Sequence, residues 1–313
     1  MKPTLVLVLL LVLVLVNALP AAEPTPLQAA VDRGVAKALA DFAGRGLKPD
    51  ELAVTAVDLA DPAAPVTAAY RGDAVIYPAS VIKLFYLAAA HRWLEDGRLD
   101  DTAELRRALR DMIVASYNEA THYVLDVLTG TTSGPELAPD ALRAWFDQRE
   151  GVNRYFHGLG YDARISANKK PWCEGPYGRE VQAIQAFTPN RNWLTTDATA
   201  RLMVEIFTDR CITPARSAQM RELLVRDVFA PVKDAEDQTH GFTGLALLEP
   251  VKQEGAKLWS KAGWTSHTRH DAAYVEFPDG RRGVVVIFTE KHATERNILP
   301  TVAREIMTAL RRR

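Results

Sequence analysis

The stretch YPASVIKLFYLAAA, residues 77–90, places a serine and a lysine at the start of an apolar run. Ser80 and Lys83 are three residues apart, so a helix that begins here carries both side chains on one face. The apolar residues after them predict that this helix is buried. Burial lowers the pKa of a lysine toward neutrality, and such a lysine can remove the proton of a serine hydroxyl. The stretch therefore predicts a buried helix that opens with a candidate nucleophile and its base.

The spacing of Ser80 and Lys83 is not specific by itself, because SANK, residues 166–169, repeats it. That second pair lies in a polar segment without helical periodicity, whereas the first begins a run typical of a core helix. A helix that starts with serine and exposes a lysine on its first turn would also fit the spacing. The choice between these interpretations depends on the rest of the chain.

Two triplets further along the chain support the catalytic interpretation. SYN, residues 116–118, interrupts a helical pattern, and KAG, residues 261–263, lies on a predicted strand where a glycine lets a substrate approach the backbone. S-x-x-K, S-x-N and K-x-G, in this order, resemble the motif set of class A β-lactamases and penicillin-binding proteins. With WLTTDATARLM, residues 193–203, these motifs give the chain a resemblance to the penicillin-recognising serine hydrolase family, over roughly residues 52–310.

This resemblance implies a set of catalytic roles. Ser80 would attack the substrate and become acylated, and Lys83 would take part in removing the serine proton. Ser116 would relay a proton to the leaving nitrogen, and Asn118 would hold a substrate side-chain amide. We expect no metal and no cofactor in this chemistry.

The same resemblance assigns the substrate-binding strand. Lys261 would supply positive charge for a substrate carboxylate and tune the proton-relaying serine, and Ala262 and Gly263 would line the substrate site. The backbone N–H groups of Ser80 and Trp264 would form the oxyanion hole. One such donor typically lowers the barrier by about 3 kcal/mol.

The chain departs from the family pattern at several positions. Tyr117 stands where the family has aspartate, Ala262 lacks the hydroxyl of the usual Thr or Ser, and Trp264 adds bulk beside the oxyanion hole. Class A β-lactamases also carry E-x-x-x-N on a loop, which holds the water that releases the acyl-enzyme. The nearby glutamates, Glu174 and Glu180, are not followed by asparagine four residues on. Without that base, acylation could occur while hydrolysis of the acyl-enzyme stalls, so the resemblance does not by itself imply efficient β-lactam hydrolysis.

These features predict an exported serine hydrolase that forms an acyl-enzyme on Ser80 and acts on β-lactams or related amides. Its substrate would be a small-molecule β-lactam or a cell-wall peptide. Two alternatives remain open. One is a cell-wall peptidase, a penicillin-binding-like acyltransferase or an esterase with slow deacylation, and the other is a non-catalytic binding protein with a relic site.

The start of the chain has the layout of a secretory signal peptide. Lys2 precedes an apolar run from Leu5 to Val16, and small residues follow it. The run is shorter than the roughly 20 residues that span a bilayer as a helix. We therefore expect cleavage after Ala18 or Ala22, no stable membrane span in the mature chain, and a periplasmic or secreted location.

The remaining periodicity predicts an α+β fold. Strand patterns come near both ends of the chain and helical patterns fill the middle, so one antiparallel sheet built from both ends is the simplest assembly, with flanking helices and an inserted all-helical subdomain. Asp279 and Gly280, between two apolar runs, predict a hairpin. We expect a signal peptide at residues 1–22 and one β-lactamase-like domain at 23–313, with a sheet subdomain at about 23–78 and 256–313 and a helical subdomain at about 79–255.

The boundaries expected for the elements follow from the same patterns. The predicted helices cover residues 26–47, 80–96, 102–116, 118–128, 139–149, 196–207, 214–226 and 295–313, the predicted strands cover 52–59, 66–70, 257–264, 271–277 and 282–290, and a long loop lies between 158 and 193.

Composition limits the remaining classes of function. The chain of 313 residues has a formal net charge of -1, so no global field attracts it to nucleic acid or to an anionic membrane. Cys173 and Cys211 can pair in an exported protein, and the sequence leaves open whether they do. His267 and His270 lack a third ligand nearby, so we interpret them as part of a polar turn after a strand and not as a metal site.

Overall fold

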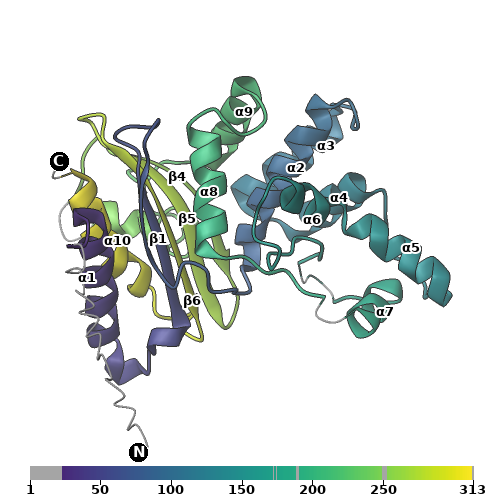
Figure 1. Cartoon of the computed structure of the whole chain (residues 1–313), viewed down its shortest axis with the longest axis horizontal. Coiled ribbons are helices and arrows are strands. Elements are labelled where there is room, and N and C mark those ends of the chain that lie inside the picture. Colours follow the sequence, from purple (N-terminus) through teal and green to yellow (C-terminus); the bar gives the residue numbers. More distant parts are fainter. Residues whose placement is uncertain (1–22, 172, 174, 188–189, 249–251, 312–313) are drawn as a thin grey trace, which may run out of the picture.

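One antiparallel sheet of six strands forms the centre of the fold, with helices on both faces (Figure 1). The structure is a computed structural model, which describes residues 23–171, 173, 175–187, 190–248 and 252–311. The strand order β2-β1-β6-β5-β4-β3 brings the two chain ends together at the β1–β6 pair, which confirms the predicted antiparallel sheet. The strands are β1 (Leu52–Asp58), β2 (Val66–Tyr70), β3 (Val225–Arg226), β4 (Lys257–Trp264), β5 (Thr268–Glu276) and β6 (Arg282–Glu290).

The sheet separates two hydrophobic cores. Successive side chains of a strand point to opposite faces. In β6, accordingly, Val284, Val286 and Phe288 lie in the core shared with the central helices, whereas Val285 and Ile287 lie in the core beneath the terminal helices. Because both faces are covered, the central strands read as almost continuous apolar runs.

The two ends of the chain close one face of the sheet. Helices α1 (Pro26–Asp41) and α10 (Ile298–Arg311) pack against each other there, as Figure 1 shows. The β5–β6 hairpin turns at Asp279 and Gly280, and Gly280 has a φ of 84°, in the left-handed region where glycine is favoured. The predicted hairpin is therefore confirmed.

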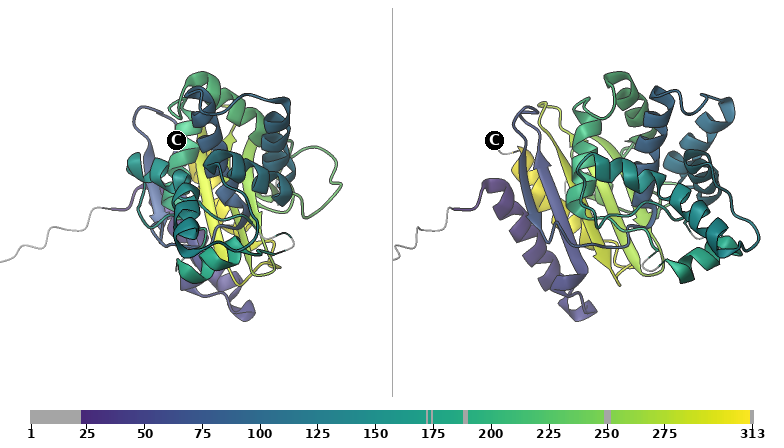
Figure 2. Two further views of the ribbon diagram at one scale, coloured as in Figure 1. Left: turned by 90° about the vertical axis from the view of Figure 1, so that its right-hand side faces the viewer. Right: turned by 45° about the vertical axis from the view of Figure 1, so that its right-hand side comes forward.

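The central part of the chain covers the other face. Helix α8 (Thr196–Phe207) packs on β1, β5 and β6, and helices α2 to α7 lie on the side away from α1 and α10 (Figure 2). Among the described residues, none of the helices has the length and apolar content to span a membrane. The remaining helices are α2 (Lys83–Glu95), α3 (Ala103–Arg110), α4 (Asn118–Thr129), α5 (Pro139–Arg149), α6 (Gly151–Gly158), α7 (Arg179–Ala186) and α9 (Pro214–Leu224).

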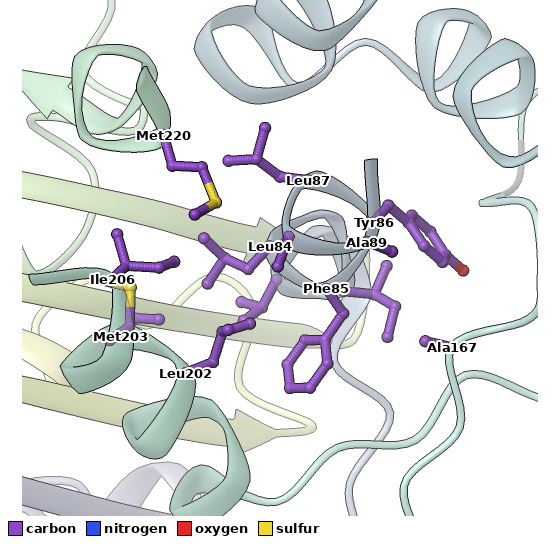
Figure 3. Close-up of a cluster of buried hydrophobic side chains, with 14 of the residues drawn as sticks. Leu84, Phe85, Tyr86, Leu87, Ala89, Ala167, Leu202, Met203, Ile206 and Met220 are labelled. Carbon is purple, nitrogen blue, oxygen red and sulfur yellow. The ribbon is translucent and has the colours of Figure 1, made fainter. Parts of the chain in front are cut away.

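Helix α2 runs through the core between the sheet and the outer helices. Its residues from Lys83 to His91 are all buried, as the apolar run LFYLAAA predicts. Figure 3 shows Leu84 and Leu87 pointing toward the side chains of α8 and α9. Burying each large apolar side chain contributes about 1.5–3 kcal/mol, so these contacts stabilise α2 in the core.

Several predicted boundaries are wrong. The helix expected from residue 80 begins as a 3-10 turn, η3 (Ala79–Ile82), and becomes α2 at Lys83. The helix expected over 102–116 ends at Arg110 and continues as a π-helical turn, η4 (Asp111–Ala115). Residues 225–226, expected in a helix, pair with β4 as β3, because this pairing satisfies their backbone groups at the sheet edge.

Two helices were not predicted. Helix α6 directly follows α5, and α7 lies within the segment expected to be a loop. The side chain of Gln182 in α7 exchanges two hydrogen bonds with the backbone of Leu137, and Ala183 packs against α5. Contacts with a distant segment therefore stabilise α7, and local periodicity does not reveal them.

Candidate active site

Ser80 lies in η3, directly before the buried helix α2. Its side chain is half-buried, and the backbone N–H of Lys83 donates to the carbonyl oxygen of Ser80. The residue before it, Ala79, has a φ of 46°, a conformation that costs an alanine of order 1–3 kcal/mol. Such strain persists only where the surroundings impose it, and here it belongs to the turn that carries Ser80 toward β4.

Lys83 is fully buried one turn after Ser80. Its Nζ donates to the Ser116 carbonyl oxygen at 2.6 Å, to Asn118 Oδ1 at 2.8 Å and to Ser116 Oγ at 3.2 Å. Burial lowers the pKa of Lys83 to about 7, because the ammonium group loses its water, while Cys173 and Glu119 raise it. Near neutral pH this amine can accept a proton, as a general base must.

Ser116 lies where the π-helical turn ends, with a left-handed φ of 59°. This backbone turn directs its hydroxyl between two amines, Lys83 Nζ at 3.2 Å and Lys261 Nζ at 2.9 Å. Both amines can donate to the oxygen, so the hydroxyl proton is left to point elsewhere. The arrangement suits a proton relay.

Lys261 reaches Ser116 from β4 and is also buried. Its Nζ donates to Ser116 Oγ, to Gln238 Oε1 at 2.5 Å and to the Ala262 carbonyl oxygen at 2.8 Å. Burial lowers the pKa of Lys261, the charges of Lys83 and Arg226 lower it further, and Asp271 opposes this. Two buried ammonium groups so close together disfavour each other, so the site favours one neutral amine and one charged amine.

Gly263 brings β4 against the turn that carries Ser80. A Cβ at Gly263 would lie 2.6 Å from the Pro78 carbonyl oxygen and 3.1 Å from the Ser80 backbone nitrogen, so only glycine fits. The Ala262 N–H points away from β5 and binds Gln238. Since alternate residues of a strand point their N–H groups the same way, the N–H of Trp264 also points away from β5. An oxyanion hole made with the Ser80 N–H requires this orientation.

The positions that depart from the family pattern have distinct environments. Tyr117 and Trp264 are 58% and 49% exposed, beside the Ser116 turn and Gly263 respectively. The methyl group of Ala262 belongs to the core beneath the terminal helices. The Ser116 turn and strand β4 form the two walls of the site, and an aromatic side chain is exposed beside each of them.

Glu180 and the second serine–lysine pair do not join the site. Glu180 is 4% exposed, and its Oε1 accepts from Arg149 Nη2 at 2.9 Å and from Ser133 Oγ at 3.0 Å. Lys169 forms an ion pair with Glu180 at 3.8 Å, while Ser166 pairs with Trp193 in an isolated bridge. Glu174 lies outside the described residues.

The structure adds site residues that the sequence interpretation missed. Gln238 comes from the loop before a 3-10 turn, η5 (Thr243–Leu247), and accepts a hydrogen bond from Lys261. His270 was interpreted as part of a polar turn, but it is a fully buried β5 residue. Its Nε2 bonds the Tyr77 carbonyl oxygen at 2.9 Å, and its Nδ1 accepts from the Thr289 N–H at 3.0 Å, which anchors the segment before Ser80. No sequence motif marks either residue.

The two cysteines differ in their relation to this constellation, because Cys173 interacts electrostatically with Lys83. Cys173 and Cys211 form no disulfide with each other, and among the described residues no three His, Cys, Asp or Glu side chains gather as metal ligands. A cavity of about 420 Å³ is lined by residues that include Glu119, Cys173 and Glu180. A larger cavity of about 630 Å³ lies between β1, β2 and α8, and no serine or lysine is among the described residues that line it.

Comparison with known proteins shows the family of this chain. The family model described as the beta-lactamase enzyme family matches residues 34–310. No curated protein matches the chain. Among solved structures, a beta-lactamase from Sphaerobacter thermophilus DSM 20745 is 20% identical with a TM-score of 0.62, and covers 89% of this chain and 97% of its own.

Two further solved structures share the fold. A beta lactamase from Xanthomonas campestris pv. campestris str. ATCC 33913 is 16% identical, with a TM-score of 0.64 and coverage of 90% of this chain and 97% of its own. PBP-A is 17% identical, with a TM-score of 0.60 and coverage of 91% and 96%. A variant of PBP-A was solved as an acyl-enzyme complex with penicillin G.

Proposed function

Because this chain belongs to the β-lactamase enzyme family, we propose that it is an exported serine hydrolase that forms an acyl-enzyme on Ser80 and acts on β-lactams or related amides. One observation carries the proposal. The hydroxyl oxygen of Ser116 accepts hydrogen bonds from the amines of both Lys83 and Lys261, on the turn and strand that border Ser80. These hydrogen bonds join the proposed base, Lys83, to the proposed proton relay, Ser116, next to the turn that carries Ser80, and this supports the proposal.

Acylation uses each of these groups once. The neutral amine of Lys83 takes the proton of Ser80 as the serine oxygen attacks the carbonyl carbon, and the oxygen that becomes negative is bound by the two backbone N–H groups. The carbon–nitrogen bond then breaks. Ser116 gives its proton to the leaving nitrogen and regains one from the Lys83 ammonium, so Lys83 is again neutral.

Release of the acyl group is proposed to be the slow step. Hydrolysis needs a base that activates water beside the ester, and Glu180 is committed to Arg149 and Ser133. This observation favours a second candidate function, that of a penicillin-binding-like acyltransferase or cell-wall peptidase that passes the acyl group to an acceptor other than water. The structural likeness to PBP-A is compatible with either function.

Labelling separates these functions. The purified protein, Ser80→Ala and the matched control Ser166→Ala, which removes the serine of the other S-x-x-K, are incubated with a fluorescent penicillin and with a chromogenic cephalosporin. Stable label on the unchanged protein and on Ser166→Ala, but not on Ser80→Ala, is the expected result. Rapid hydrolysis of the chromogenic cephalosporin by the unchanged protein would instead support an efficient β-lactamase. Failure of every serine-directed probe to label Ser80 would refute the catalytic proposal and leave the non-catalytic binding protein.

Export is proposed from the apolar segment between Leu5 and Val16, which lies outside the described residues. Expression of the full chain with mass analysis of the mature N-terminus tests it. A chain that begins after Ala18 or Ala22 and lies in the periplasmic or secreted fraction is expected. An uncleaved chain retained in the membrane would contradict the proposal.

A further inference from the structure

Gln238 links the two walls of the Ser80 site through four hydrogen bonds. Its Oε1 accepts from Lys261 Nζ at 2.5 Å and from the Ala262 N–H at 3.2 Å. Its Nε2 donates to the carbonyl oxygens of Ile113 at 3.1 Å and Val114 at 2.9 Å, in the π-helical turn that leads to Ser116. This carboxamide thus links the Lys261 end of strand β4 to the Ser116 turn, and Arg226 Nη2 makes a second link by donating to the carbonyl oxygens of Ile113 at 3.1 Å and Ser260 at 2.9 Å.

The sheet leaves this position open. The edge strand β3 pairs only Val225 with Trp259 and Arg226 with Leu258, so it ends before β4 reaches Lys261. An unpaired N–H at a buried strand edge is costly, and the Gln238 side chain supplies the acceptor that a longer β3 would have supplied. The π-helical turn needs hydrogen-bond donors, because the carbonyl groups at the end of a helix lack helical partners. The Gln238 Nε2 supplies a donor to two of them, those of Ile113 and Val114.

The loop around Gln238 is clamped on both sides. Glu236 accepts from the buried Arg269 at 2.5 Å, and Arg269 also donates to the Gly241 carbonyl oxygen at 2.6 Å. Asp237 accepts from the His240 N–H at 2.6 Å and lies 3.0 Å from its ring Nδ1. The loop is therefore preorganised, so Gln238 reaches Lys261 without a further ordering cost when substrate binds.

We propose that Gln238 is a positioning residue for acylation, whose carboxamide holds the Lys261 ammonium against Ser116 and fixes the Ser116 turn relative to β4. The proposal rests on the function proposed above for Ser80. Gln238 does not itself need to touch the substrate. It sets the position and the charge of Lys261, the residue proposed to contact the substrate.

The other groups that face Lys261 are Lys83 from α2, Arg226 from β3, Asp271 from β5 and Ser116. They stay unchanged when Gln238 is replaced. Gln238→Ala removes an acceptor that stabilises the charged amine, so the pKa of Lys261 should fall. Gln238→Glu places a carboxylate there, so the pKa of Lys261 should rise.

Two measurements test this inference. The titration of Lys261 is followed by NMR on lysine-labelled protein, with Lys261→Arg to assign the signal, and the acylation rate is followed with the fluorescent penicillin as a function of pH. Gln238→Ala should lower the acylation rate about tenfold to a hundredfold, the effect of losing a hydrogen bond to a charged group. In Gln238→Ala the decline of the acylation rate at high pH should begin at lower pH, because Lys261 loses its charge earlier. In Gln238→Glu this decline should begin at higher pH.

Gln28→Ala is the matched control, because Gln28 likewise exchanges two hydrogen bonds with the backbone of a strand, at Ala69 of β2 on the far edge of the sheet. It should leave the acylation rate and its pH profile unchanged. If Gln238→Ala fails to fold, the titration of Lys261 in the nearly isosteric Gln238→Glu tests the inference.

An unchanged Lys261 titration in the folded Gln238 variants would overturn the inference. The NMR titration decides even if the unchanged protein takes no penicillin label. In that case the proposed function fails and the link between Gln238 and Lys261 is still measured.

Discussion

Gly263 lies so close to Ser80 that a Cβ at Gly263 would be 3.1 Å from the backbone nitrogen of Ser80. The strand that carries Lys261 and the turn that carries the nucleophile are thus in direct backbone contact. This approach brings the two proposed oxyanion donors to one place, although they are far apart in the sequence.

Substitution of Gly263 by alanine should separate these two elements. The added methyl group would clash with the Pro78 carbonyl oxygen, at 2.6 Å, so the strand must shift and one oxyanion donor is displaced. We expect an acylation rate on the order of a hundredfold lower or more. Gly44→Ala is the control, because a Cβ at Gly44 meets nothing within 4 Å. Equal acylation rates for the two variants would contradict the predicted geometry.

The acylation rate should depend on pH through Lys83. With a pKa of about 7, the amine is protonated and cannot accept a proton at lower pH, so the rate should fall as pH decreases through about 7. Labelling rates between about pH 5 and 9 measure this limb. A rate independent of pH over that range would exclude Lys83 as the base, and Lys83→Arg, which stays charged, should abolish acylation.

Glu119 should set part of that pH dependence. Its carboxylate raises the pKa of Lys83, so Glu119→Gln should move the midpoint of the acid limb to lower pH. Because Glu119 is exposed, the shift should be a few tenths of a pH unit and should shrink in high salt. Glu222→Gln, at an exposed position on α9, serves as the control and should leave the midpoint in place.

Glu180 should contribute to stability and not to release of the acyl group. Removing its charge takes away one of the two carboxylate partners of the buried Arg149, at 2.9 Å, and leaves Asp126 at 3.2 Å. Loss of a buried partner lowers the free energy of unfolding by up to about 3–5 kcal/mol, and the remaining Asp126 pair should keep the loss at the low end of this range. Chemical denaturation of Glu180→Gln measures this. Decay of the acyl label should keep its rate, and a label that becomes markedly longer-lived would show that Glu180 serves deacylation after all.

Glu104→Gln provides the comparison for the stability measurement. Glu104 forms an exposed ion pair with Arg107, which water and salt screen, so its loss should change the free energy of unfolding little. A similar loss in both variants would mean that burial does not set the strength of the Glu180 pair.

The sequence by itself determined much of this protein. The period of two in the strands, the apolar run after Ser80 and the Asp279–Gly280 turn are local signals, and they predicted the antiparallel sheet, the buried helix α2 and the β5–β6 hairpin. The order of S-x-x-K, S-x-N and K-x-G selected Ser80 over Ser166, although both have the same spacing to a lysine.

Only the tertiary structure decided how the site works. The lowered pKa of Lys83 arises from burial by elements distant in the chain, and the pairing of Lys261 with Ser116 depends on how β4 meets the π-helical turn. Gln238 and His270 belong to no motif, because a hydrogen bond across the sheet edge or to the segment before Ser80 leaves no periodic trace in the sequence. Local patterns fix secondary structure, whereas charge and proton transfer depend on which distant groups share a dry interior.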